Sequence, residues 1–112
     1  MNIRYAERSE VEKFQLYNED NQGNEFIVVE SGEEVVGFAQ FDSGADDCTV
    51  YFMESEAKGA GRAMIEWFQA EFVEVVANDA IDTAQSFYRH FGFEQSGPKG
   101  FDGRMNMTWW AE

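Results

Sequence analysis

The sequence predicts an α+β fold in which helices flank a central mixed sheet that is mostly antiparallel. Two β-patterned runs, 26–30 and 35–41, are separated by a turn-forming stretch and predict a β-hairpin. A third run, 48–53, leads through a glycine-rich turn into an amphipathic stretch and then into the short β-branched run 73–77. Such a strand, helix, strand crossover makes its two strands parallel. At 112 residues, the chain is long enough for one core, so 1–112 is expected to be a single domain.

The N-terminal third predicts one strand and one short helix. Residues 2–7 alternate weakly and are expected to form the first strand. Ser9 and Glu12 have the spacing of a capping box, so we expect a helix that buries Val11 and Phe14, with Leu16 and Tyr17 as further candidates. The turn-rich stretch 18–24 should then lead into the hairpin.

The glycine-rich turn is followed by a helix over 59–72, because apolar residues recur there at intervals of three and four. They are Ala60, Met64, Trp67, Phe68 and Phe72, whereas Arg62, Glu66, Gln69 and Glu71 take other faces.

The C-terminal third predicts a second helix and two strands. Asp82 and Gln85 are spaced as a capping box, and Gly92 is placed as the C′ residue that ends the helix. The apolar stripe of this helix is Ala84, Phe87, Tyr88 and Phe91. A short strand is expected at 93–95, and in a last strand Met105, Met107 and Trp109 should share one face, opposite Asn106, Thr108 and Trp110.

The chain is acidic, with 22 Asp and Glu against eight Lys and Arg and a net charge of −14. That balance works against direct binding of nucleic acid or anionic membranes. No apolar run is long enough to span a bilayer and the first residues hold no signal-peptide core, so a cytoplasmic protein is expected. Cys48 is the only cysteine, and its place in an apolar strand predicts a buried, inert thiol. The acids of 42–47 do not fit a calcium loop, and we expect no metal site.

The stretch 56–63, Glu-Ala-Lys-Gly-Ala-Gly-Arg-Ala, is a candidate phosphate site. Glycines allow close approach of the backbone, and the first N–H groups of a helix have no intrahelical partner. Lys58 and Arg62 add local positive charge. The alternative is an ordinary tight connection, and the spacing is neither a dinucleotide fingerprint nor a Walker loop.

Two segments together resemble the GNAT superfamily of N-acetyltransferases. Residues 49–65 look like the acyl-CoA signature of that family, in which a strand and Gln/Arg-x-x-Gly-x-Gly/Ala precede a helix. Residues 84–93, Ala-Gln-Ser-Phe-Tyr-Arg-His-Phe-Gly-Phe, are similar to the A-x-x-F-Y-x-x-x-G-F ending of the family. The resemblance covers about residues 26–110 and implies the GNAT-like acyltransferase fold.

The resemblance also implies a set of site residues. Backbone amides of the turn should hold the pyrophosphate of acetyl-CoA, and unpaired groups near Phe52, Met53 and Glu54 should bind the pantetheine arm as an added strand would. The implied cofactor-binding residues are Phe52, Met53, Lys58, Gly59, Ala60, Gly61, Arg62, Ala63, Asn78, Ala84 and Phe87.

Tyr88 matches the residue that in many members donates a proton to the departing thiolate, although a core tyrosine is the alternative. Glu54 is the first candidate for the general base, and Glu56 and His90 are weaker ones. Glu56 stands where the family usually has Gln or Arg, so it should repel phosphate unless it points away. The region before the hairpin has room for one helix where the family usually has two.

The sequence therefore predicts an acetyl-CoA-dependent N-acetyltransferase that moves an acetyl group to a primary amine by direct attack. The acceptor would be a small molecule or a peptide, and the acidity slightly favours cationic amines. A non-catalytic GNAT-fold binding or regulatory module and an acidic interaction protein are the alternatives. The aromatic last strand makes a homodimer plausible.

Overall fold

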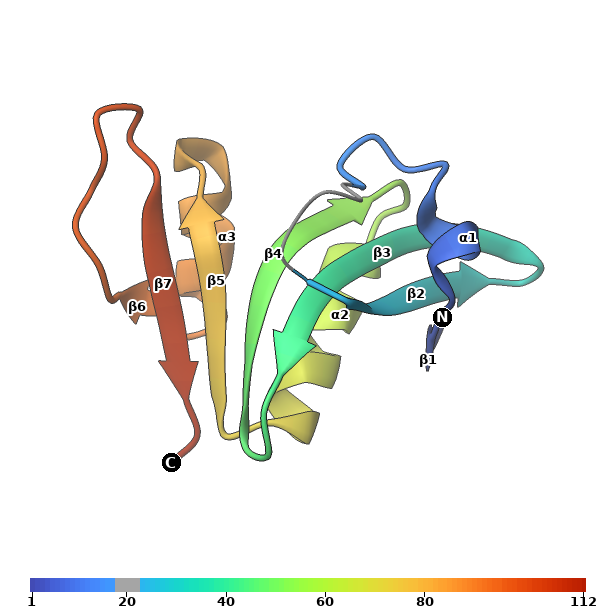
Figure 1. The fold of residues 1–112 in the computed structure, drawn as a ribbon, viewed down its shortest axis with the longest axis horizontal. Helices are drawn as coiled ribbons and strands as arrows, with labels where there is room; N and C mark the ends of the chain where they lie inside the picture. Colours follow the sequence, from blue (N-terminus) through green and yellow to red (C-terminus); the bar gives the residue numbers. More distant parts are fainter. Residues whose placement is uncertain (18–22) are drawn as a thin grey trace.

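The computed structural model describes residues 1–17 and 23–112 and contains one mixed sheet with three helices among them (Figure 1). Most of the turn-rich stretch expected at 18–24 lies outside the described residues. The elements are β1 (Asn2–Tyr5), α1 (Arg8–Val11), β2 (Glu25–Ser31), β3 (Glu34–Ser43), β4 (Asp47–Ser55), α2 (Ala60–Glu71), β5 (Glu74–Ala80), α3 (Asp82–His90), β6 (Glu94–Gln95) and β7 (Met105–Trp110).

The sheet has the strand order β1-β2-β3-β4-β5-β7-β6. Strands β2 and β3 form the expected antiparallel hairpin, and β4 and β5 are the parallel pair joined through α2. All other neighbouring strands are antiparallel. The mixed, mostly antiparallel sheet predicted from the sequence is therefore confirmed.

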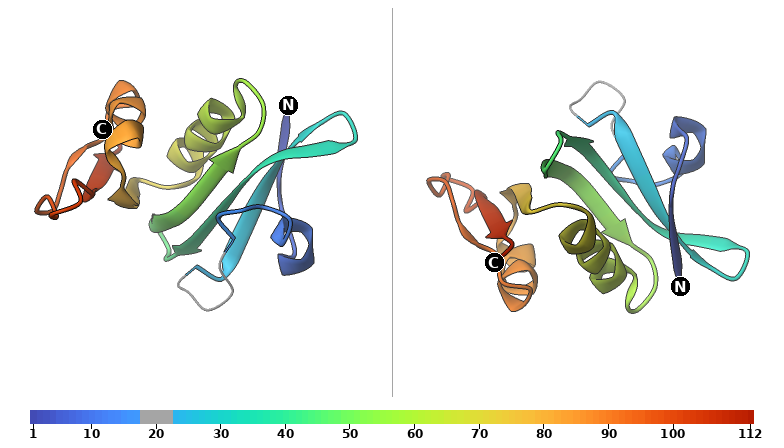
Figure 2. Two further views of the ribbon diagram at one scale, coloured as in Figure 1. Left: turned by 90° about the horizontal axis from the view of Figure 1, so that it is seen from above. Right: turned by 90° about the horizontal axis from the view of Figure 1, so that it is seen from below.

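The helices lie on both faces of the sheet, with α2 and α3 on one face and α1 on the other (Figure 2). The larger core lies under α2 and α3, where Met64, Ile65 and Phe68 of α2 meet the inward side chains of the strands. A smaller core under α1 joins Val11 and Phe14 to three strand residues. The core-packed helix that the apolar spacing predicted is therefore confirmed as α2.

Both predicted capping boxes are wrong. The capping box of α1 is formed by Glu7 and Glu10, and the Glu7 N–H donates to the Glu10 carboxylate at 2.8 Å. Arg4 binds the same carboxylate at 2.7 Å and so fixes this earlier start. In α3 the N-cap residue is Ile81, because the Gln85 side chain is buried and donates to carbonyl groups elsewhere.

The predicted inward residues of the last strand are correct for Met105 and Met107, which are fully buried. Thr108, expected on the opposite face, is buried as well, and its hydroxyl donates to Ser96 Oγ at 2.7 Å, which satisfies this polar group. Cys48 is buried as predicted.

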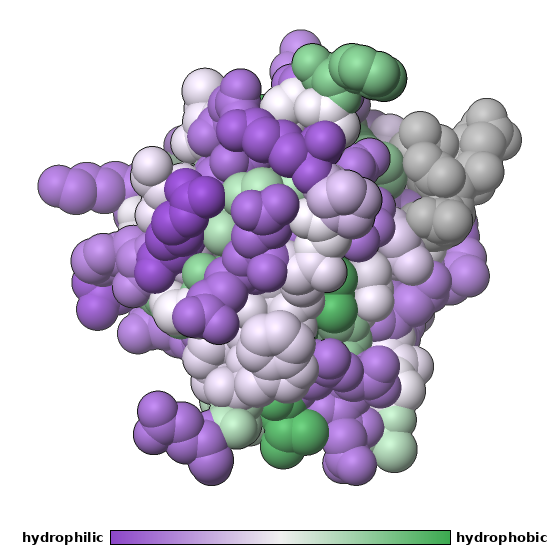
Figure 3. Space-filling model, turned by 90° about the vertical axis from the view of Figure 1, so that its left-hand side faces the viewer, coloured by the Kyte–Doolittle hydropathy of each residue, from purple (hydrophilic) through white to green (hydrophobic). Residues whose placement is uncertain are grey.

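The surface over β6, β7 and α3 is mostly hydrophilic, with hydrophobic residues in isolated positions (Figure 3). Within the described ranges, none of the helices has the length and apolar character that a bilayer crossing needs.

Candidate active site

Strands β4 and β5 separate after a short parallel ladder, and this separation creates the site (Figure 1). Their pairing runs from Asp47 opposite Glu74 to Val50 opposite Ala77 and then stops, although both strands continue. Residues 52–55 stay paired with β3 on their other edge, whereas Tyr51 has no partner in β3. An irregularity between Gln40 and Phe41 in the β3–β4 register coincides with the point where the two strands part. The backbone edges that face the gap are left without a neighbouring strand.

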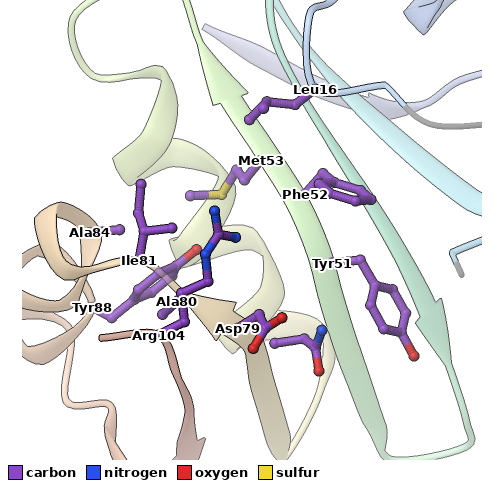
Figure 4. Close-up of a pocket in the computed structure, with 11 residues that line it drawn as sticks. Leu16, Tyr51, Phe52, Met53, Asp79, Ala80, Ile81, Ala84, Tyr88 and Arg104 are labelled. Carbon is purple, nitrogen blue, oxygen red and sulfur yellow. The ribbon is translucent and has the colours of Figure 1, made fainter. Parts of the chain in front are cut away.

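A pocket of about 380 Å³ occupies the gap (Figure 4). One bank comes from β4 and the segment after α1, and the other from the end of β5, the start of α3 and Arg104, the residue before β7. The lining residues are Leu16, Tyr51, Phe52, Met53, Asn78, Asp79, Ala80, Ile81, Ala84, Tyr88 and Arg104. The structure therefore brings together five of the residues that the resemblance implied: Phe52, Met53, Asn78, Ala84 and Tyr88.

Tyr88 is 8% exposed, and it lines the pocket from α3. Burial raises the pKa of its phenol to about 12, so the hydroxyl stays protonated at neutral pH. In the described part of the chain, every fully buried side-chain polar atom has a hydrogen-bond partner, whereas the Tyr88 hydroxyl makes no hydrogen bond there. The hydroxyl oxygen is thus not fully buried. The hydroxyl is therefore accessible in the pocket as a hydrogen-bond donor for a ligand.

The glycine-rich turn has the geometry of an open helix N-terminus. Gly59 is the N-cap residue with φ 89°, a left-handed conformation that strongly favours glycine. Among the described residues, the N–H groups of Gly61 and Arg62 donate to no protein acceptor, whereas that of Ala63 is bound by the Gly59 carbonyl. These free N–H groups point outward from the start of a helix of 12 residues.

Gly61 also lets α2 approach α3 closely. A Cβ atom placed on Gly61 would lie 3.4 Å from Cζ of Phe87 and 4.0 Å from Cβ of Ser55. Phe87 thus borders the turn from the neighbouring helix and does not line the pocket itself. The turn and the pocket are adjacent, because Ser55 ends the strand that forms one bank.

The charged residues of the turn are all exposed. Arg62 pairs with Glu66 one helical turn later, with Nε and Oε1 3.6 Å apart, and Lys58 is in none of the ion pairs of the described residues. Glu56 pairs with neither of them among those residues, and its side chain lines a separate depression together with Lys13 and the hairpin turn. Lys58 is thus free to meet an anion at the turn, Arg62 shares its charge with Glu66, and Glu56 takes part in a different surface feature.

Glu54 and His90 do not line the pocket. The carboxylate of Glu54 accepts a hydrogen bond from the Leu16 N–H at 3.0 Å, which ties β4 to the segment after α1. His90 is exposed at the end of α3, with its ring edge-on to Phe91. Glu54 lies near the pocket through Leu16, whereas His90 lies outside it.

Sequence reasoning missed Asp79 and Arg104, which both line the pocket. Asp79 has φ 55°, a left-handed backbone conformation that non-glycine residues rarely adopt, and its N–H donates to Asn106 Oδ1 at 2.8 Å. This break in the extended backbone near the end of β5 could not be read from strand alternation. Arg104 precedes the buried Met105, so strand alternation was a signal that its side chain points away from the core.

The comparisons with known proteins agree with this geometry. Residues 22–95 match the family model described as the acetyltransferase (GNAT) domain, so the chain belongs to the GNAT acetyltransferase family. This membership places it among proteins whose acetyl donor is acetyl-CoA. A search of curated proteins returned no match.

Several solved structures are similar in fold. Ard1 from Thermoplasma volcanium has a TM-score of 0.69 at 16% identity, with 99% of this chain and 97% of that chain covered. A putative N-acetyltransferase from Lactobacillus plantarum has a TM-score of 0.67 at 19% identity, with 99% and 98% covered. PaiA N-acetyltransferase from Thermoplasma acidophilum, solved with coenzyme A, has a TM-score of 0.61 at 16% identity, with 76% and 59% covered. The chain thus spans 59% of PaiA, and likewise 65% of PH1933 from Pyrococcus horikoshii.

Proposed function

We propose that this chain is an acetyl-CoA-dependent N-acetyltransferase that acetylates a primary amine by direct attack. The observation that carries the proposal is the pocket between the separated strands β4 and β5, with the Tyr88 hydroxyl in its wall and the open start of α2 beside it. The free N–H groups at Gly61 and Arg62 suit a pyrophosphate. The unpaired edge of β4 near Phe52 and Met53 suits the amides of an extended pantetheine arm.

In this proposal the amine nitrogen attacks the thioester carbonyl, so that a C–N bond forms and the C–S bond breaks. The nitrogen loses a proton to Glu54 through water, because Glu54 lies beside the pocket and not in its lining. The sulfur leaves as a thiolate and receives a hydrogen bond, and finally a proton, from the Tyr88 hydroxyl, which then regains a proton from solvent water. The raised pKa of Tyr88 keeps its hydroxyl protonated at neutral pH, so that it can donate a hydrogen bond to the developing thiolate.

Calorimetric titration with acetyl-CoA tests the proposed donor site. We expect saturable binding that Gly61→Leu weakens at least tenfold, because its side chain would occupy the space against Phe87 and cover the free N–H groups. Ala70→Leu is the matched control, since Ala70 is exposed near the other end of α2. Thermal unfolding confirms that both variants are folded. Absence of heat with the unchanged protein at millimolar acetyl-CoA would refute the proposal.

Tyr88→Phe tests the proposed proton donor. We expect kcat to fall about 100-fold while the Kd for acetyl-CoA stays within a factor of two, because only the hydroxyl is removed. Thiol release across a panel of amines measures the rate. Unchanged turnover would remove Tyr88 from the mechanism. Tight acetyl-CoA binding without turnover on any amine would favour the non-catalytic module.

The homodimer remains a prediction. Trp110 is 51% exposed at the end of β7, where it lies opposite Glu74. The neighbouring Val73 is also exposed, and its carbonyl accepts the Ala111 N–H. Mass measurement in solution decides between a monomer and a dimer.

A further inference from the structure

Arg104 gives the pocket a positive charge that the proposed transfer reaction does not use. Of the described residues that line the pocket, it is the one cation. Figure 4 shows its guanidinium reaching from the β7 bank into the space between that bank and Met53. In a chain with a net charge of −14, a cation at this place marks a local preference for an anionic group.

The backbone that carries Arg104 is held firmly. Gln85, 4% exposed, donates from Nε2 to the Ala80 carbonyl at 3.0 Å and to the Gly103 carbonyl at 2.8 Å. One buried amide therefore ties the end of β5 and the loop that leads into β7 to α3. The Arg104 carbonyl also accepts the Gly100 N–H at 2.8 Å, which closes the loop before β7.

The guanidinium itself is available to a ligand. Its recorded partner is Asp102, with Nε and Oδ2 3.3 Å apart, and both side chains of the pair are about half exposed or more. Exposed ion pairs of this kind contribute little to stability, so a ligand can compete with Asp102 at small cost. The terminal nitrogens, which can form two parallel hydrogen bonds to a carboxylate, are not engaged in the described part of the protein.

The pocket also holds one negative charge that is not paired with Arg104. Asp79 lines it, and none of the ion pairs found among the described residues includes Asp79. A ligand with charges of both signs can interact with both residues. A purely cationic amine, the class slightly favoured by the overall acidity, would meet the guanidinium as a like charge.

We propose that Arg104 selects the acceptor, which is an amine that carries a carboxylate, as a free amino acid does. The inference rests on the proposed N-acetyltransferase function and names its acceptor class. The carboxylate binds the terminal nitrogens of Arg104, and Asp79 attracts the ammonium group before it loses its proton. The acceptor is then oriented with its nitrogen directed into the pocket that Tyr88 lines.

The test compares amino acids with their carboxamides, which have the same shape but lack the negative charge. We expect the unchanged protein to acetylate the amino acids at least tenfold more efficiently in kcat/KM, chiefly through KM. Arg104→Gln should lower kcat/KM for the amino acids about 10- to 100-fold and leave that for the carboxamides within a factor of two. Arg104→Lys should restore part of the loss. Arg89→Gln is the matched control, because Arg89 is exposed on α3 and outside the pocket.

Several outcomes overturn the inference while the proposed function stands. One is an equal kcat/KM of the unchanged protein for amino acids and for their carboxamides. Another is an equal loss of kcat/KM on all acceptors in Arg104→Gln. A third is a raised KM for acetyl-CoA in Arg104→Gln, which would mean that Arg104 binds the donor. If no acceptor turns over, amino acids are titrated into the protein saturated with CoA. Binding that depends on Arg104 supports the inference, and absence of binding refutes it. Failure of acetyl-CoA to bind at all refutes the proposed function instead.

Discussion

Burial sets the protonation state of two side chains, Cys48 and Tyr88. Cys48 is 1% exposed, and burial together with nearby Asp47 and Glu25 raises the pKa of its thiol to about 12. Burial alone has the same effect on the pKa of Tyr88. Both groups are therefore neutral at pH 7. For Cys48 this means an unreactive thiol, since the thiolate is the nucleophile. For Tyr88, which borders the pocket, it means a hydrogen-bond donor.

The raised pKa of Cys48 predicts a loss of stability at alkaline pH. Below pH 9, the ordinary pKa of the thiol, both folded and unfolded states hold the proton, and the contribution of Cys48 is complete. Between pH 9 and about 12 only the unfolded state ionises, so the free energy of unfolding falls by up to about 1.4 kcal/mol per pH unit. Urea unfolding of the protein and of Cys48→Ala at pH 8, 9 and 10 measures this. The difference between the two should shrink as pH rises, and parallel curves would contradict the assignment.

At the scale of elements, α2 links the core to the site. Its inner face packs on the strands, with the ring of Phe68 edge-on to Phe41 at a centroid distance of 5.1 Å. Its first residues provide the free N–H groups beside the pocket. Packing of the helix body therefore holds the proposed pyrophosphate site in place.

Two Phe→Ala substitutions, one at a buried and one at an exposed position, test whether packing of Phe68 holds α2 on the sheet. Phe68→Ala should lower the free energy of unfolding by about 3–5 kcal/mol, because Phe68 is fully buried and its removal leaves a cavity. Phe101→Ala should change it by less than about 0.5 kcal/mol, because Phe101 is fully exposed. Urea denaturation checks both, and similar values for the two variants would contradict the packing described.

The elements also show what sequence could predict. Periodicity gave the hairpin, α2 and the crossover correctly, because strand and helix periods depend on local spacing of apolar residues. The capping boxes of α1 and α3 were predicted wrongly, because Arg4 and the carbonyl groups of Ala80 and Gly103 engage the polar side chains of Glu10 and Gln85. Family motifs pointed to Tyr88, which lines the pocket, and to the glycine-rich turn beside it, and their proposed roles stay predictions. Arg104 joins the pocket only through the pairing of β7 with β5.

At the scale of the whole molecule, net charge opposes compactness. The charge is −14, and the depression lined by Glu56 also contains Glu10, Glu33 and Glu34, with Lys13 as its single cation among the described residues. Like charges this close destabilise the folded state unless salt screens them.

We therefore expect the melting temperature to rise as NaCl is increased from 10 to 500 mM. A gain of about 1 kcal/mol would correspond to roughly 4 °C for a domain of this size. The double variant Glu33→Gln/Glu34→Gln should melt higher at low salt and respond less to NaCl, because it removes two of the clustered charges. A melting temperature that falls with salt in both proteins would contradict this reading of the surface.

The gap between β4 and β5 also bears on self-association. Unpaired strand edges are the usual place where one β-sheet protein aggregates with another. Here the free edge of residues 51–55 lies inside the sheet, with β5 and β7 continuing beyond the gap. A strand of a second folded molecule is part of a wider sheet, which is too large to fit into the gap between β4 and β5. A single extended ligand chain is narrow enough to fit there. The protein thus keeps a backbone edge ready for a ligand without offering it to other copies of itself.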